Sequence, residues 1–426
     1  MIGSSNPLLT ALMNSRFILT GALLLGVLHA RAESPRVLTD SYLADLRQQA
    51  VHQHPKVAAA HARAQAADAG VRAVRLWDDP ELGLGVTFAD REMRRDDGDV
   101  RVSFSQPLPR RAVFQAERTK ASAETATKRA ETRDAALMAG REAATTAIEL
   151  ALADEVVAFQ STQLDWTGKM AANARDKALD PSGSAIEGLR LEGELARDRQ
   201  MIESARRNRI GIARRLNVIL GKPLDAPWPE LRLPGRAGPT PIAAGEVARI
   251  SRRNPSYLAK IREIDVAAAG VSVAEAERKP AFAVEVEANF YSGGDFRDTM
   301  VGFKMSLPWF NEPVYRARID QADRLAVAAA KDAEALKREL AGKVVATVTE
   351  AENSAREART FESDVLPAME KAADATESAW IGSKALLSEV LEARRALLTT
   401  RLEQRRAIAA QLAALEELET LVPRQP

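Results

Sequence analysis

The chain has 426 residues, and 60 Lys and Arg residues nearly balance 59 Asp and Glu residues, which gives a formal net charge of +1 at pH 7. This balance gives no electrostatic reason to expect nucleic acid as a partner. Because the sequence contains no cysteine, disulfides, cysteine-ligated metal sites and thiol nucleophiles are excluded.

The segment 1–32 has the features of a secretory signal peptide. Arg16 precedes an apolar run of 12 residues, Phe17 to Leu28, and Ala30-Arg31-Ala32 supplies the small residues of a signal-peptidase site. As a helix the run would extend only about 18 Å, too short for a bilayer core of roughly 30 Å. We expect cleavage after this motif and export without a lipid anchor, which would require a cysteine. The alternative is a buried N-terminal helix, and Met13 is a second candidate start.

Two halves of the sequence follow one pattern. Ala69-Gly70-Val71 recurs as Ala269-Gly270-Val271, and His54-Pro55 recurs as Asn254-Pro255, both at an offset of 200 residues. Spacing that is preserved in this way indicates an internal duplication.

A proline-rich linker separates the halves. Six prolines fall between Pro223 and Pro241, where they forbid a continuous helix or a central strand. We therefore assign 33–222 to the first repeat, 223–241 to the linker and 242–426 to the second repeat.

Each repeat is predicted to contain a helix, a strand hairpin, a very long helix and a medium helix. Residues 111–178 lack proline and are rich in strong helix formers, so this helix would extend roughly 100 Å. In chain order the predicted elements are a helix from residue 55, a β-hairpin at 81–107, helices at 111–178 and 183–220, a helix at 255–278, a β-hairpin at 281–308, and helices at 314–380 and 383–422. Pro367 is expected to kink the helix that contains it.

The lengths of the helices predict how they pack. Helices 183–220 and 255–278 together nearly match the length of helix 111–178. Helix 383–422 and the helix that begins at Pro55 match the second long helix in the same way. We expect two shorter helices, stacked end to end, along each long one.

Apolar and polar residues alternate along four strands. One apolar and one charged face fit an outer-membrane barrel with lipid outside and water inside, and the alternative is a sandwich with one solvated face. Four strands cannot close a barrel, and open sheet edges are not tolerated in lipid, so several chains must share one barrel. The residues expected to face lipid are Leu82, Leu84, Val86, Phe88, Val284, Val286, Val301 and Phe303.

In the order and spacing of these features the chain resembles the TolC-like outer-membrane factors, the exit ducts of tripartite efflux pumps and type I secretion systems. The matching features are the signal peptide, the duplicated segments beginning HPKVAAAHA and NPSYLAKIR, the strand ends SFSQPLP and KMSLPWF, and the tip segment WIGSKALLSEVLEARRAL. The resemblance implies a mainly α fold with a small β part. It implies a homotrimer with a shared twelve-stranded barrel in the outer membrane and a periplasmic tunnel of twelve helices.

The same resemblance implies partners and a cargo. The partners are outer-membrane lipid, a periplasmic adaptor protein and an inner-membrane transporter of the resistance-nodulation-division type. Ser306-Leu307-Pro308-Trp309-Phe310-Asn311 is similar to a strand end of the heavy-metal cation efflux branch, although Glu312-Pro313-Val314 departs from the glycine-containing continuation expected there. Metal-cation export is the first interpretation, and multidrug efflux and protein secretion stay open.

Two helix reversals lie farthest from the predicted barrel. The resemblance implies that they dock a helical hairpin of the adaptor, and the alternative is a plain helix turn, for which Gly382 is suited. The tip residues are Asp180, Pro181, Ser182 and Gly183 in the first repeat and Trp380, Ile381, Gly382 and Ser383 in the second.

An acidic pair follows the second tip. Glu389 and Glu392 lie at i and i+3, on one helix face, and resemble the aperture segment of the family. Three copies would form a ring that favours cations. Glu187 and Arg190 occupy the corresponding places in the first repeat and are candidates for a local ion pair. The alternative is that these side chains are solvated helix charges.

Other classes of protein are remote alternatives. The sequence contains no phosphate-binding loop, catalytic histidine pair or nucleophile elbow, so no enzyme activity and no cofactor are expected. His52, His54 and His61 are candidates for a metal site, and the position of His54 before Pro55 favours a helix cap instead. A coiled-coil scaffold would not account for the four strands in which apolar and polar residues alternate.

Overall fold

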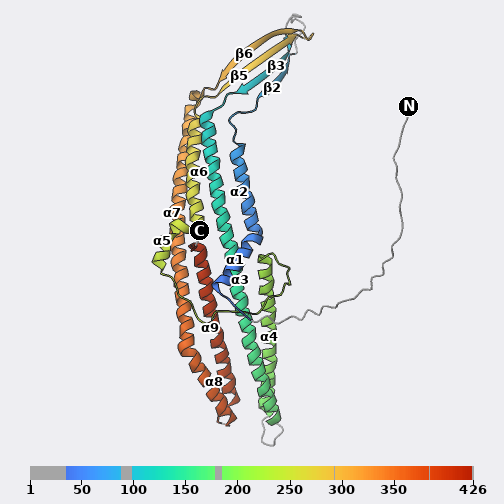
Figure 1. The fold of residues 1–426 in the computed structure, drawn as a ribbon, viewed down its shortest axis with the longest axis vertical. Coiled ribbons are helices and arrows are strands. Elements are labelled where there is room, and N and C mark those ends of the chain that lie inside the picture. The colour runs from blue at the N-terminus through green and yellow to red at the C-terminus, as the bar shows by residue number, and fades with distance from the viewer. Residues whose placement is uncertain (1–34, 88–97, 178–184, 292, 383, 425–426) are drawn as a thin grey trace, which may run out of the picture.

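The computed structural model is an elongated bundle of long helices with a four-stranded sheet at one end (Figure 1). It describes residues 35–87, 98–177, 185–291, 293–382 and 384–424. The predicted signal peptide lies outside these residues. The expected mainly helical fold with a small β part is confirmed.

The first repeat starts with two short helices rather than one. Its elements are α1 (Asp40–Gln53), α2 (Pro55–Ala73), β2 (Glu81–Val86), β3 (Gly98–Pro107), α3 (Arg111–Lys177) and α4 (Ala185–Ile219). His54 separates α1 from α2 because a residue before proline is restricted to extended backbone. Its Nδ1 accepts a hydrogen bond from the Lys56 amide at 3.2 Å, so His54 caps α2.

The second repeat has the same order of elements. They are α5 (Ala243–Arg253), α6 (Pro255–Glu277), β5 (Phe282–Tyr291), β6 (Phe296–Met305), a 3₁₀ turn (Pro308–Asn311), α7 (Glu312–Thr360), α8 (Leu366–Ile381) and α9 (Leu387–Leu421). Asn254 caps α6 by accepting from the Tyr257 amide at 2.7 Å, and it donates to the Leu421 carbonyl at 3.0 Å. The short helices α1 and α5, which were not among the predicted elements, occupy corresponding places.

The second long helix is not one rod. The predicted helix 314–380 is divided into α7 and α8 by a π-helical turn at Phe361–Val365. Pro367 lies in the first turn of α8, where it has no amide hydrogen to donate and its ring crowds the preceding turn. A wider turn relieves this crowding, so the irregularity falls just before the proline.

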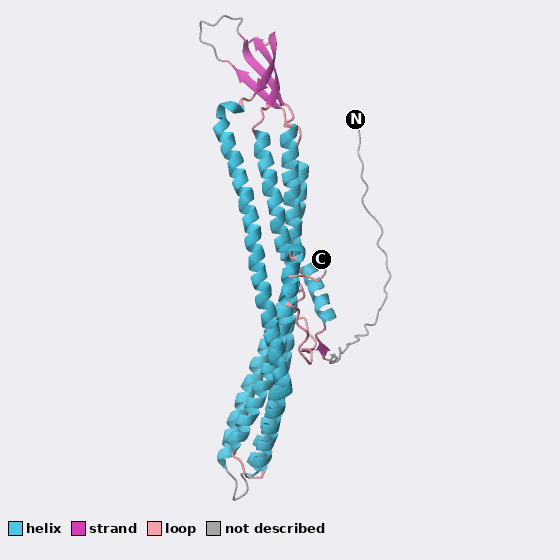
Figure 2. Ribbon diagram, turned by 90° about the vertical axis from the view of Figure 1, so that its left-hand side faces the viewer, coloured by secondary structure: helices cyan, strands magenta, loops and turns pink. Residues whose placement is uncertain are grey.

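The long helices form one layer of four columns (Figures 1 and 2). The columns are α2 with α4 below it, α3, α6 with α9 below it, and α7 with α8. Their order follows the sheet order β2-β3-β5-β6, because α2 leads into β2, β3 into α3, α6 into β5 and β6 into α7.

This order corrects the predicted stacking of the shorter helices. α2 packs against α3 and not along the second long helix, and α6 lies between α3 and α7. The cause is the pairing of β3 with β5, which joins the two repeats at the centre of the sheet and leaves β2 and α2 at one side.

Alanine-rich surfaces hold the columns together. A mid-height cluster includes Ala143, Ala144, Ala147 and Ala151 of α3, whose small side chains permit close approach of the helices. A second cluster joins α5, α7 and α9 around Ile250, Val344 and Leu418. None of the helices in the described ranges is both long and apolar enough to cross a membrane.

The linker crosses the helices at mid-height. Within it β4 (Leu231–Arg232) pairs in parallel with β1 (Arg36–Val37). The linker therefore contains a short strand. Within the described residues β4 pairs with a neighbour on one side only, and prolines are tolerated near such an edge strand.

Candidate functional site

The sheet sorts its side chains onto two faces. The antiparallel register aligns Leu82, Phe104, Val286 and Val301 across all four strands. The apolar face so defined comprises Leu82, Leu84, Val86, Val100, Val102, Phe104, Phe282, Val284, Val286, Val301, Phe303 and Met305. Much of it is uncovered, since Leu84 is 76% and Val301 73% exposed.

All predicted lipid-facing residues that the structure describes share this face, and Phe88 lies outside the described residues. Phe282 and Phe303 stack on it with ring centroids 5.5 Å apart. Contact of this face with lipid stays a prediction.

The opposite face carries paired charges. Arg101 forms an ion pair with Glu287 at 2.9 Å, and Lys304 with Glu285 at 2.7 Å. These pairs run between neighbouring strands, where opposite charges stabilise a sheet. A face of this kind is suited to contact with water.

The sheet has two open edges. β2 pairs only with β3, and β6 only with β5, among the residues that the structure describes. Backbone amides and carbonyls along both edges are therefore available for another strand.

At the opposite end, the tips of four helices pack around an apolar cluster. Met170 of α3, Leu191 of α4, Trp380 of α8 and Val390 of α9 belong to it. Trp380 is only 8% exposed, which corrects its predicted place on the docking surface: it stabilises the tip from within. Exposed Ile381 and Gly382 stay candidates for docking, whereas Asp180, Pro181, Ser182, Gly183 and Ser383 lie outside the described residues.

The acidic pair lies on the surface just above this tip. Glu389 and Glu392 are exposed and line one shallow groove of about 510 Å³ between α8 and α9. The Glu389 carboxylate accepts from the Leu386 amide at 3.0 Å, so it also caps α9. Glu392 makes no ion pair with any described residue.

The corresponding pair in the first repeat is arranged differently. Glu187 and Arg190 lie at the start of α4, and no ion pair joins them among the described side chains. An ion pair further along α4 links Arg175 of α3 to Glu192 at 2.5 Å. The predicted local pair of Glu187 and Arg190 is therefore wrong in this structure.

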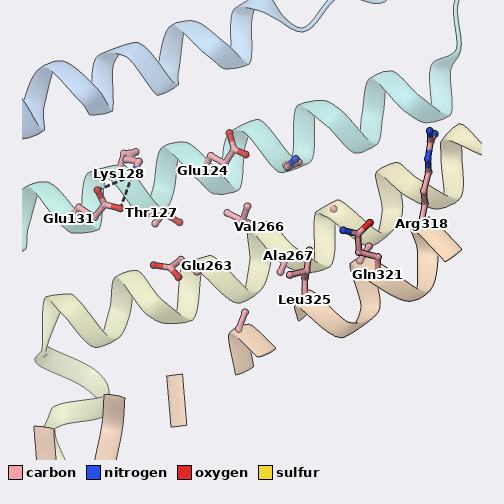
Figure 3. A pocket seen from close by; sticks show the side chains of 14 residues that line it. Glu124, Thr127, Lys128, Glu131, Glu263, Val266, Ala267, Arg318, Gln321 and Leu325 are labelled. Atoms are coloured by element: carbon pink, nitrogen blue, oxygen red, sulfur yellow. Dashed lines mark hydrogen bonds and ion pairs between the residues drawn. The ribbon is translucent and has the colours of Figure 1, made fainter. Parts of the chain in front are cut away.

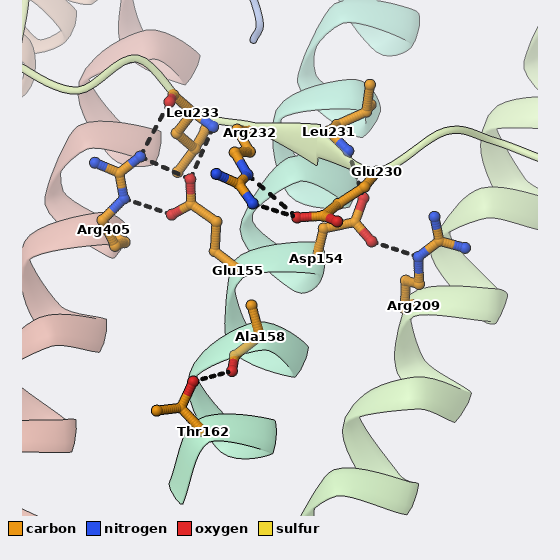
Figure 4. A network of polar contacts seen from close by, with 10 residues as sticks. All are labelled: Asp154, Glu155, Ala158, Thr162, Arg209, Glu230, Leu231, Arg232, Leu233 and Arg405. Carbon is orange, nitrogen blue, oxygen red and sulfur yellow. Dashed lines mark hydrogen bonds and ion pairs between the residues drawn. The ribbon is translucent and has the colours of Figure 1, made fainter. Parts of the chain in front are cut away.

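A buried polar network at mid-height escaped the sequence analysis (Figure 4). Asp154 accepts from the Leu231 amide at 2.9 Å and from Arg209 of α4, and Glu155 accepts from the Leu233 amide at 2.9 Å. Glu155 also pairs with Arg405 of α9, whose Nη2 lies 2.7 Å from Oε1. Two adjacent residues of α3 thus hold the linker against both repeats.

Burial raises the pKa of the Asp154 carboxyl above its ordinary value of 3.8, although hydrogen bonds from Arg209 and the Leu231 amide oppose the rise. Sequence could not identify this network. The pairing arginines lie 55 and 250 residues away, and Asp-Glu dipeptides on helices are common surface features.

The histidines that the structure describes belong to no cluster of three or more potential metal ligands. The described residues contain no group of three or more potential metal ligands of the His, Cys, Asp or Glu type. His54 caps α2, and its Nε2 lies 3.6 Å from Glu142 of α3. This residue therefore positions the hinge between α1 and α2.

A family model identifies the family of the chain. A model of the outer membrane efflux protein family matches residues 46–222 and 248–423, once in each repeat. No curated protein sequence matches the chain.

Solved structures of other proteins share the fold, among them the following three. A membrane protein from Pseudomonas aeruginosa has TM-score 0.76 and 16% identity, covering 90% of this chain and 93% of that one. The outer membrane protein VceC from Vibrio cholerae has TM-score 0.71 and 17% identity, covering 89% and 96%. CusC has TM-score 0.70 and 15% identity, covering 91% and 93%. Likeness at these identities shows the fold alone.

The family model accounts for most of the chain, and its two matches coincide with the duplicated elements. The chain therefore belongs to the outer membrane efflux protein family: it is an outer-membrane channel of tripartite efflux systems with a periplasmic helical extension, and a transport protein rather than an enzyme.

Proposed function

We propose that three copies of this chain close a twelve-stranded barrel in the outer membrane and continue as a twelve-helix tunnel through the periplasm. The observation that carries the proposal is the sheet with one apolar face, one ion-paired face and two open edges. In lipid such edges must be paired. Joining β6 of one copy to β2 of the next pairs every edge and keeps lipid and water on opposite faces.

The helical layer supports the same assembly. Its two outer columns carry exposed apolar side chains, among them Leu189 and Val218 on α4 and Leu325 and Val327 on α7. Contact between the α7–α8 column of one copy and the α2–α4 column of the next would cover such residues, and three layers of four columns would enclose a tunnel.

Crosslinking between edges tests this assembly. The chain has no cysteine, so Leu84→Cys and Phe303→Cys together place the only thiols, one on β2 and one on β6. A flexible bismaleimide should then join chains into covalent trimers, whereas either single variant should give no species above a dimer. Monomers in the outer membrane, shown by light scattering and an absence of crosslinks, would contradict the proposal.

The tunnel in this proposal is a passive duct for metal cations, coupled by a periplasmic adaptor to a pump of the resistance-nodulation-division type. The strand end at Ser306 to Asn311 and the exposed acidic pair Glu389 and Glu392 support this cargo. Ile381 and Gly382 are the proposed adaptor contacts. Deletion of the gene should sensitise cells to metal salts, and sensitivity to drugs alone would assign multidrug efflux instead.

We also propose that segment 1–32 directs export and is then cleaved, and that the mature chain carries no lipid anchor. The sequence features at Arg16 and Ala30-Arg31-Ala32 support it. N-terminal sequencing of protein from outer membranes should begin at Glu33, and a chain that retains residues 1–32 would contradict cleavage.

A further inference from the structure

A pocket of about 390 Å³ lies at mid-height between α1, α3 and the junction of α5 with α6. Its volume is within the range of small-molecule sites. Val51 of α1, Leu137 of α3 and Leu258 of α6 contribute to a lining that is mainly apolar. The pocket takes no part in the sheet or in the tip described above.

Four arginines and no acidic residue line this pocket. Arg47 pairs with Glu416 at 3.4 Å, and Arg253 donates to the carbonyls of Pro423 and Arg424 at 3.2 and 3.0 Å. The two others, Arg133 and Arg252, have no hydrogen bond or ion pair with any residue that the structure describes. The pocket therefore combines apolar walls with an excess of positive charge.

A second cavity shows that this excess is not general. The cavity of about 740 Å³ between α3, α6 and α7 is also lined by basic side chains, but three glutamates accompany them (Figure 3). Lys128 there donates to Glu131 at 2.8 Å, and Glu263 accepts from Lys260 at 2.6 Å. Three basic and three acidic side chains line this second cavity, so it has no comparable excess of positive charge.

We infer that the mid-height pocket binds an anionic amphiphile, a molecule with one carboxylate or phosphate head and a short hydrocarbon tail. The walls would cover the tail, and the free guanidinium groups of Arg133 and Arg252 would hold the head through charge-assisted hydrogen bonds. Two compounds serve as controls. Inorganic phosphate has an anionic head without a tail, and a cationic amphiphile has a tail with a head of the opposite charge.

Titration of the full-length protein, held in phosphatidylcholine nanodiscs without free detergent, tests the site with octanoate as probe, and empty nanodiscs give the blank. Calorimetry should show that each chain binds one octanoate. Inorganic phosphate should not bind, and octyltrimethylammonium should bind much more weakly than octanoate. Arg133→Glu with Arg252→Glu should lower octanoate affinity about tenfold or more. Ala136→Phe, which fills the pocket without removing a charge, should lower it similarly, while Arg199→Glu on the exposed surface of α4 should leave it unchanged.

The variants are checked for wild-type mass and thermal unfolding, and Arg133→Gln with Arg252→Gln replaces the glutamate variant if that one fails to assemble. Absence of octanoate binding to the wild type would overturn the inference, as would equal affinity in the pocket variants or equal affinity for octyltrimethylammonium. A change of assembly state in every pocket variant, with no octanoate bound by the wild type, would show instead that another chain covers the pocket.

Discussion

Two acidic pairs on this chain have similar composition and opposite surroundings. Asp154 and Glu155 lie at mid-height, where both are buried and each is held by an arginine and a backbone amide. Glu389 and Glu392 lie on the surface near the tip, and neither forms an ion pair among the described residues. The first pair holds the linker in place, whereas the second is exposed to solvent.

The largest expected effect is on stability at mid-height. Glu155→Ala leaves the Leu233 amide without its acceptor and Arg405 without its carboxylate partner, so the free energy of unfolding should fall by about 3–5 kcal/mol. Glu392→Ala should change it by no more than about 0.5 kcal/mol. Thermal or denaturant unfolding of the purified assembly measures both, and equal losses would remove the distinction between the two pairs.

The two faces of the sheet can be compared through adjacent residues of one strand. Val301 lies on the apolar face, and Met300 pairs with Glu287 on the charged face. Val301→Arg should cost about 2–4 kcal/mol if it reaches the bilayer midplane. Met300→Arg should be tolerated because the new charge lies beside a carboxylate. The yield of assembled protein in outer membranes reports both, and equal yields would reject the assignment of the faces.

The pH dependence of stability should separate Asp154 from the exposed acids. Because its pKa is raised by burial, the folded protein keeps this proton to higher pH than the unfolded chain. The free energy of unfolding therefore falls as pH rises from 3.8 through the raised value. Asp154→Asn lacks this contribution, so its stability should fall less over that window than that of the wild type. Identical slopes in thermal unfolding would contradict the assignment.

Local patterns predicted much of the fold and little of the contact between its parts. Strand alternation and the duplicated His54-Pro55 and Asn254-Pro255 segments are properties of short stretches, and the structure contains the strands and helix caps that they indicate. The column order depends on the pairing of β3 with β5, a contact between repeats that no local pattern encodes. The linker network is hidden for the same reason.

The prediction that Trp380 is exposed rested on its position in the sequence and was wrong. It lies two residues before Gly382, which made it a candidate for the exposed reversal, but the phase of α8 turns its ring into the tip cluster. Helix phase near a reversal depends on the packing of four helices, so it became visible only in three dimensions.

The most direct test of the cation duct is the reversal potential of the reconstituted channel across a salt gradient. Glu389→Gln with Glu392→Gln removes both charges and keeps an acceptor for the Leu386 amide, so α9 should stay capped and the assembly intact. The wild type should be cation selective, and the double variant should lose most of that preference. An unchanged reversal potential in the double variant would show that these carboxylates do not line the path of the ions.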